Sequence, residues 1–175
     1  MPNWVYNDFA IECDNAIVLM SVCVFLSEGD RLIDFNNVIP CPSELNDSEL
    51  HTYGGGERKA AERDKKRKEA KDKFGFCNSI DFATEMWGTK WNACDIKHGG
   101  IQKDGDWFAI YKFKTAWCPP IPVIVRLSER FVDCKFHLYC TEECGNFDPV
   151  HYEIKGGKVI SQKPFCPSDF EQSDK

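Results

Sequence analysis

The sequence predicts an α+β fold in which helices cover one face of an antiparallel sheet. Two observations lead to this prediction. Apolar and polar residues alternate in several segments, as they do in half-buried strands. These segments are separated by stretches that carry helix-capping residues, in the order strand, helix, strand, inserted helices, hairpin, helix and further strands. The 175 residues suffice for one domain with a hydrophobic core, which we expect over 1–165, followed by a flexible tail over 166–175.

The first elements are predicted from alternation and caps. Residues 4–13, WVYNDFAIEC, alternate as a strand. Asp14 or Asn15 can cap a following apolar helix that stops near Gly29. Residues 31–35, RLIDF, are predicted as a second short strand, and the prolines that follow it exclude regular structure there.

A helical insertion is predicted over residues 48–87. Within it, residues 54–73, GGGERKAAERDKKRKEAKDK, begin with three glycines and continue with charges of both signs. Its only apolar residues are alanines, so this helix has no apolar stripe to bury and is expected to project into solvent. A second, short helix over 79–87 has Asn78 or Ser79 as its cap.

The second half of the chain continues with strands and one helix. Gly88 is placed to end the short helix, after which residues 89–96 are predicted as a strand running to a turn at 97–100, KHGG. Residues 106–115, DWFAIYKFKT, return as another strand.

Prolines then occupy the first turn of a helix whose apolar face is formed by Val123, Ile124 and Leu127. Two strand segments follow, VDCKFHLYC at 132–140 and VHYEIKGGKVIS at 150–161, and the second contains its own Gly-Gly hairpin.

Charge and hydropathy restrict the class of partner. The net charge of −6 argues against general affinity for nucleic-acid backbones. The longest apolar stretch, residues 16–26, is about half of what a membrane-spanning helix needs. The N-terminal residues lack the pattern of a secretory signal. We therefore expect a soluble, cytoplasmic protein with no membrane partner.

The ten cysteines admit two interpretations. Cys134, His137, Cys140 and Cys144 lie within eleven residues, and thiolate and imidazole are preferred zinc ligands. However, strand alternation places Cys134 and Cys140 on the same face as Phe136 and Leu138. It places His137 on the other face. That arrangement favours core thiols, which should be reduced in a cytosol, so we expect neither a metal site nor a cofactor.

Four segments carry a family resemblance: MPNW at 1–4, DFNNVIPCP at 34–42, WGTKWNA at 87–93 and TAWCPP at 115–120. Together and in this order they resemble the YubB-like, or Api-like, family of proteins carried by plasmids and bacteriophages. The resemblance implies a ferredoxin-like domain, a mobile-element origin and a workplace in the bacterial cytosol. It implies no established activity. The chain departs from the family at Val5, where members often have Cys, and in its long charged insertion.

The usual catalytic motifs are missing from the sequence. There is no G-x-S-x-G, no H-E-x-x-H, no phosphate-binding loop of the Walker type and no Rossmann glycine pattern. The four histidines are scattered along the chain, and the ferredoxin-like topology does not imply an iron–sulfur cluster. We therefore expect a protein that is not an enzyme.

Two tryptophan-bearing stretches, 87–96 and 113–120, provide the candidate site. One interpretation is that their tryptophans form hydrophobic corners of the core. The other is a binding cleft, because the nearby lysines fall out of phase with the aromatic residues, and an aromatic wall rimmed by ammonium groups suits a flat base with phosphates. The candidate ligand-binding residues are Trp87, Thr89, Lys90, Trp91, Lys112, Lys114, Thr115 and Trp117.

Two functional hypotheses follow. The first is a non-catalytic accessory protein that sequesters a small nucleotide-like ligand, such as a host immune signal, and so counteracts host defence. The alternative is a direct inhibitor of a host bacterial protein, acting through the acidic surface and the charged helix at 57–73. Assembly into a homo-oligomer is compatible with both.

Overall fold

The computed structural model describes residues 2–51 and 57–166. Its strands are β1 (Trp4–Cys13), β2 (Cys94–Asp104), β3 (Asp106–Ala116), β4 (Lys135–Glu142), β5 (Val150–Lys155) and β6 (Lys158–Pro164). Its helical elements are α1 (Ala16–Leu26), α2 (Phe35–Val38), the 3-10 turn η1 (Ser43–Asn46), α3 (Ser48–His51), α4 (Glu57–Phe74), α5 (Ser79–Phe82), the π-helical turn η2 (Ala83–Trp87) and α6 (Ile121–Arg130).

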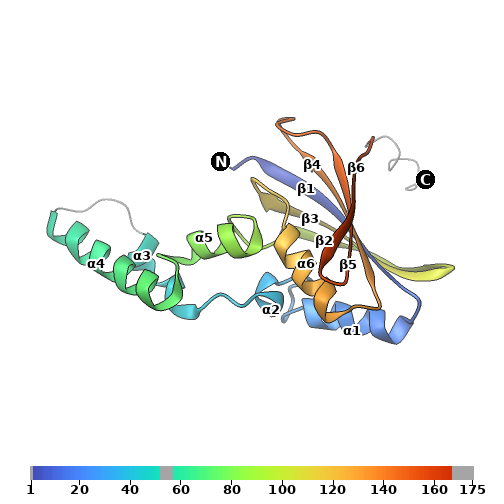
Figure 1. The fold of residues 1–175 in the computed structure, drawn as a ribbon, viewed down its shortest axis with the longest axis horizontal. Helices are drawn as coiled ribbons and strands as arrows, with labels where there is room; N and C mark the ends of the chain where they lie inside the picture. The colour runs from blue at the N-terminus through green and yellow to red at the C-terminus, as the bar shows by residue number, and fades with distance from the viewer. Residues whose placement is uncertain (1, 52–56, 167–175) are drawn as a thin grey trace.

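The strands form one antiparallel sheet in the order β2-β3-β1-β4-β5-β6 (Figure 1). The succession β1, α1, β2, β3, α6, β4 with the sheet order β2-β3-β1-β4 is the ferredoxin-like arrangement. The β5–β6 hairpin extends the sheet beyond β4. The predicted α+β class is therefore confirmed.

The core lies between one face of this sheet and the helices. Strand β1 alternates along its whole length, and its buried residues are Val5, Asn7, Phe9, Ile11 and Cys13. Phe9 is the cross-strand partner of Tyr111 in β3 and Leu138 in β4, which are buried on the same face. Helix α1 covers them with Leu19, Val22 and Leu26, and α6 with the predicted Val123, Ile124 and Leu127.

The predicted helix caps are confirmed. The Asn15 side chain accepts hydrogen bonds from the backbone N–H groups of Ile17 and Val18, at 2.9 and 3.4 Å. Gly88 follows η2 with φ of 76°, the left-handed conformation that only glycine adopts without strain. Proline stands in the first turn of α6.

The strand predicted over 31–35 is wrong. Arg31 makes only an isolated bridge with Glu28, and Phe35 begins helix α2. The reason is a competing cap: the Asp34 carboxylate accepts a hydrogen bond from the backbone N–H of Asn36 at 2.8 Å, which favours a helical turn at this point.

The strand and turn predicted over 89–100 also need correction. Strand β2 begins only at Cys94 and runs through the predicted KHGG turn. Gly100, with φ of 99°, lies at one of two irregularities in the pairing with β3, and these let the strand continue. The chain reverses instead at Gly105, whose φ is 68°.

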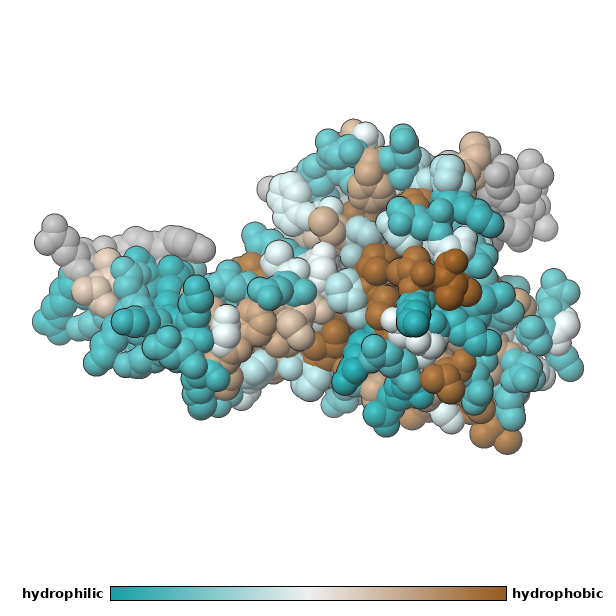
Figure 2. Space-filling view, in the orientation of Figure 1, coloured by the Kyte–Doolittle hydropathy of each residue, from teal (hydrophilic) through white to brown (hydrophobic). Residues whose placement is uncertain are grey.

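Helix α4 projects away from the sheet, as predicted (Figure 1). Its surface in Figure 2 is mostly hydrophilic. The helix is nevertheless anchored, because the Arg67 guanidinium donates to the Leu50 carbonyl at 2.7 and 2.9 Å and Lys66 pairs with Glu49. Ala70 also packs against the edge of the core.

The three glycines that open the charged segment, at 54–56, and residues 167–175 of the predicted tail lie outside the described residues. Within the described ranges, no helix combines the length and the apolar character needed to cross a membrane.

Candidate functional site on the open face of the sheet

The face of the sheet turned away from the helices carries a different set of side chains. On β1 these are the residues between the core positions, and none is fully buried: Trp4, Tyr6, Asp8, Ala10 and Glu12. By register, Lys112 and Lys114 of β3 and His137 and Tyr139 of β4 lie on the same face. This open face therefore combines aromatic rings, a histidine and charged side chains.

One end of the open face gathers aromatic rings and ammonium groups. We call Trp4, Tyr6, Lys90, Trp91 and Lys114 the aromatic–lysine cluster. The ring centroids of Trp4 and Trp91 are 6.0 Å apart. The Lys90 Nζ lies 5.3 Å from the Trp91 ring, and the Lys114 Nζ lies 5.5 Å from the Tyr6 ring. Both lysines are within cation–π distance, while Tyr6 remains 43 % exposed and Trp91 38 %.

The segment that carries Lys90 and Trp91 is held on both sides. Before it, the Thr89 hydroxyl donates to the Ala116 carbonyl at 2.9 Å and accepts from the Ala116 N–H at 3.1 Å. After it, the Asn92 amide donates to Asp34 at 2.7 Å and accepts from the Phe35 N–H at 3.0 Å. These side-chain bonds replace strand pairing and fix an irregular stretch against the end of β3.

A groove of about 500 Å³ adjoins the cluster. Its lining includes Tyr6, Asp8 and Ile96 together with three lysines, Lys97, Lys112 and Lys114. Two of these lysines are paired in the structure.

The Lys112 ammonium lies 3.7 Å from Asp8, and the Lys114 ammonium lies 2.7 Å from Asp95. The hydrogen bond from Lys114 lowers the pKa of Asp95, and the same bond raises the pKa of Lys114. Both groups of this pair are therefore charged at neutral pH.

Three predicted site residues are buried in the structure. Trp87 is 6 % exposed, its indole N–H donates to the Ile39 carbonyl at 2.9 Å, and its ring packs edge-on against Phe35 and Phe82. For Trp87, the interpretation as a hydrophobic corner of the core is therefore confirmed. Thr89 and Thr115 are also buried, so none of the three can contact a ligand on the open face.

Thr115 belongs to a buried polar network. Its hydroxyl accepts from the Asn7 amide at 3.0 Å and donates to the Cys118 carbonyl at 2.9 Å. Its side chain points to the core because it is two residues from Phe113 on the same strand. Trp117, by contrast, is 48 % exposed with φ of 73°, and its backbone N–H donates to the Asn3 carbonyl.

The structure therefore brings together only part of the predicted set. Lys90, Trp91 and Lys114 join one cluster, and Lys112 lines the adjoining groove. The rings that complete the cluster, Trp4 and Tyr6, were not predicted. Alternation in β1 was the available signal, because residues out of phase with the core positions must face outward.

A second polar group, which we call the histidine cluster, lies along β1, β4 and β5: Glu12, Lys135, His137, His151 and Glu153. The Glu12 carboxylate lies 2.9 Å from the Lys135 Nζ and 2.8 Å from the His137 Nε2. Burial alone would raise the pKa of Glu12, but the hydrogen bonds from Lys135 and His137 lower it below its ordinary value. Burial, together with the neighbouring His137, lowers the pKa of His151.

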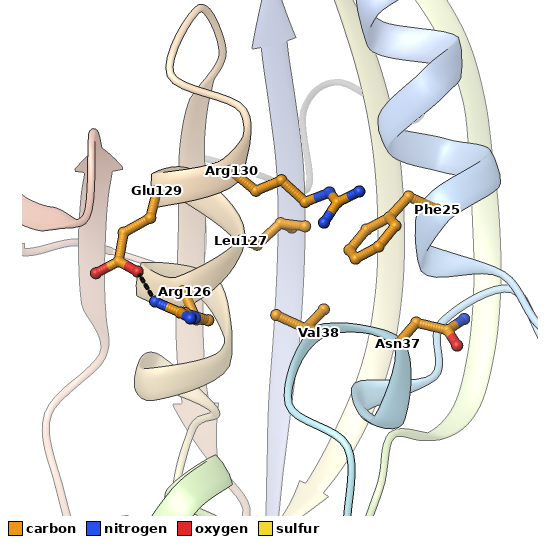
Figure 3. A pocket seen from close by; sticks show the side chains of 7 residues that line it. All are labelled: Phe25, Asn37, Val38, Arg126, Leu127, Glu129 and Arg130. Atoms are coloured by element: carbon orange, nitrogen blue, oxygen red, sulfur yellow. Dashed lines mark hydrogen bonds and ion pairs between the residues drawn. The ribbon is translucent and has the colours of Figure 1, made fainter.

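The helical side of the molecule has a hollow of about 310 Å³ between α1, α2 and α6 (Figure 3). Val38 and Leu127 contribute its apolar lining. Its cations are already engaged, because Arg126 pairs with Glu129 and the Arg130 guanidinium lies 4.4 Å from the centre of the Phe25 ring. No predicted site residue lines this hollow.

Cys134 and Cys140, which were predicted to be core thiols, are buried with Phe136 and Leu138. His137 faces the other side of β4. The alternation argument for these residues is thus confirmed. Burial raises the pKa of both Cys134 and Cys140, so each is a protonated thiol at neutral pH.

Comparison with known families identifies the class of this fold. The family described as "Ferredoxin-like domain in Api92-like protein" matches residues 86–174, which are 89 of the 175 residues. The chain therefore belongs to this family of ferredoxin-like domains in Api92-like proteins, and the Api-like resemblance is confirmed at that level.

Among solved structures, the chain is similar to the crystal structure of a protein api92 from Yersinia pseudotuberculosis. The TM-score is 0.54 at 9 % sequence identity, over 95 % of this chain and 99 % of that chain. At this identity the likeness establishes the fold alone. No curated protein matches the chain.

Proposed function

We propose that the protein is a non-catalytic binding protein that holds a small, planar, anionic ligand of the nucleotide class at the aromatic–lysine cluster. The observation that carries the proposal is the Trp4–Trp91 ring pair, with the Lys90 ammonium over the Trp91 ring and the Lys114 ammonium over the Tyr6 ring. A groove of about 500 Å³, lined in part by Tyr6 and Lys114, adjoins these rings. The proposed site keeps Lys90, Trp91 and Lys114 of the predicted set and adds Trp4 and Tyr6.

The cluster offers the two interactions that such a ligand needs. Stacking of a base on an exposed aromatic ring contributes roughly 1–3 kcal/mol. A phosphate group can attract the Lys114 ammonium in competition with Asp95, and it can pair with Lys97 in the same groove. Because the exposed lysines attract the anion through their charge, we expect binding to weaken as salt screens them.

The biological part of the proposal rests on the sequence resemblance. Proteins of plasmids and bacteriophages act inside a bacterial host, and a small non-catalytic domain can oppose host defence by holding a nucleotide signal at high occupancy. We propose that role, in the bacterial cytosol, for this protein. The nine cysteines from Cys13 to Cys144 are free thiols, which is compatible with a reducing compartment.

A thermal-shift panel of linear and cyclic nucleotides, followed by calorimetric titration of those that raise the Tm, tests the proposal. Trp91→Ala should weaken binding by roughly 5- to 150-fold, the equivalent of 1–3 kcal/mol of stacking. Because Trp91 is 38 % exposed, the same change should reduce the free energy of unfolding by only about 1–2 kcal/mol. Trp87→Ala should cost about 3–5 kcal/mol of stability.

Lys114→Gln should weaken binding of phosphorylated ligands and reduce its salt dependence. A matched control is Lys103→Gln, since the Lys103 Nζ lies 5.2 Å from the Trp107 ring outside the cluster, and this variant should bind as the wild type does. A panel with no stabilising nucleotide, or unchanged affinity in Trp91→Ala, would contradict the proposal.

The alternative, direct inhibition of a host protein, makes a different prediction. Much of helix α4 is exposed and charged, so a host protein that co-purifies with the wild type should be lost when residues 57–73 are deleted. Such a result, together with a negative nucleotide panel, would replace the proposed function by the alternative.

A further inference from the structure

We propose that the histidine cluster binds one divalent metal ion of the zinc type, through the imidazoles of His137 and His151 and the carboxylate of Glu153. The proposal is independent of the ligand site above, because it rests on different residues along β4 and β5. A negative result for ligand binding at the aromatic–lysine cluster would not contradict the metal site, and a negative result for metal binding would not contradict the ligand site.

Strand pairing places the three ligands on one surface. In the β4–β5 register, His137 is the partner of Glu153 and Tyr139 is the partner of His151. Since residues two apart on a strand face the same side, all of these side chains project from the open face. The candidate ligand atoms of His137, His151 and Glu153 lie within 4.8 Å of one another.

The two imidazoles are already at the separation that a shared metal requires. The His137 Nδ1 and the His151 Nε2 are 3.2 Å apart. Two ligand atoms about 2.0–2.1 Å from a tetrahedral zinc ion are about 3.3 Å from each other. In the metal-free protein this contact is a hydrogen bond. The metal would replace it, and the ring proton of His151 would move from Nε2 to Nδ1.

The environment of His137 favours a free Nδ1 for a ligand bond. Its Nε2 lies 2.8 Å from the Glu12 carboxylate, which is itself held by Lys135 at 2.9 Å. A carboxylate at this position keeps the ring proton on Nε2 and leaves the lone pair on Nδ1, the nitrogen directed at His151. Metal-binding histidines in proteins typically have this second carboxylate contact.

The ring of His151 is oriented by its neighbour. The Tyr139 ring stacks on it with centroids 3.9 Å apart and an interplanar angle of 5°. Such a contact covers one face of the imidazole and leaves its nitrogen edge available. The ring planes of His137 and His151 differ by 16°, and the Nδ1 of His137 forms a hydrogen bond with the Nε2 of His151. Metal binding requires both rings to turn so that their lone pairs converge toward Glu153.

The donor set selects the class of metal. Two imidazoles and one carboxylate match zinc sites that keep a fourth position open for water. Magnesium and calcium prefer oxygen ligands alone, and copper(I) prefers sulfur. The thiols of Cys134 and Cys140 are buried on the opposite face of β4, so they cannot complete this site.

Titration of the reduced protein with Co²⁺, followed by competition with Zn²⁺, tests the site. We expect one ion per chain and a visible spectrum of nitrogen and oxygen ligation without the intense near-ultraviolet band of a cobalt–thiolate bond. His151→Ala and Glu153→Gln should each weaken binding at least tenfold. Glu12→Gln removes no metal ligand but changes the contacts of Glu12 with His137 and Lys135. It should weaken metal binding by roughly 10–100-fold.

The matched control is His98→Ala. His98 is also a strand histidine that contacts a tyrosine ring, with centroids 4.8 Å from Tyr111, so its loss should leave metal affinity unchanged. Circular dichroism of each variant establishes that it is folded, and His151→Gln replaces His151→Ala if the alanine variant is not. Absence of bound metal in the wild type, retention of binding by a His137→Ala/His151→Ala double variant, or a cobalt–thiolate band would each overturn the proposal.

Discussion

The covered and the open faces of the sheet are built from alternate residues of the same strands, yet they differ in composition and in what they can do. On β1, Phe9 and Ile11 are buried under the helices, while Tyr6 and Glu12 lie on the other side. The covered face contributes most of the apolar burial that stabilises the fold. The open face carries both candidate sites, and a change there should alter binding more than stability.

This difference can be tested most strongly at neighbouring positions of β1. Phe9 is 1 % exposed and packs against Phe113 and Phe136, so Phe9→Ala should lower the free energy of unfolding by about 3–5 kcal/mol. Tyr6→Ala, on the open face, should lower it by about 1 kcal/mol or less. Urea denaturation of both variants provides the measurement, and equal losses would mean that the open face is also a packed surface.

A smaller effect is expected from the buried polar network of the covered face. Thr115→Val removes the acceptor of the Asn7 amide and the donor to the Cys118 carbonyl, which should cost about 1–3 kcal/mol because buried polar groups lose their partners. Thr141→Val on the open side of β4 is the control and should be nearly neutral. If Thr115→Val is equally neutral, the Val5 and Phe113 carbonyls that also accept from Asn7 suffice for its amide.

The smallest predicted effect depends on pH. Burial opposes ionisation of Asp34, but hydrogen bonds from Asn36 and Asn92 lower its pKa below the ordinary 3.8. The folded state therefore binds this proton less readily than the unfolded chain does. The resulting stabilisation is complete above the ordinary pKa and is lost as the pH falls through the lowered one.

Asp34→Asn should accordingly be less stable than the wild type at pH 7, by about 1 kcal/mol. The difference should shrink when unfolding is measured below pH 3.8. A difference that stays constant across this range would mean that the charge of Asp34 does not contribute.

The sequence predicted the elements whose signals are local. Alternation identified β1 and β3, side-chain caps identified the start of α1, and the Gly-Gly pair identified the β5–β6 hairpin. The predictions failed where a side chain competed with the expected pattern. Asp34 capped a helical turn inside a predicted strand, and two irregularities in pairing allowed β2 to pass through its glycines.

Alternation also determined which side of each strand a residue faces, including the separation of Cys134 and Cys140 from His137. It did not determine which residues meet across the sheet. Trp4 contacts Trp91, and His137 contacts both Glu12 and His151, only because β1 lies between β3 and β4 and because β5 pairs with β4. Alternation is a property of neighbouring residues, whereas strand order and register arise from contacts between segments far apart in the chain, so only the tertiary structure could bring these sites together.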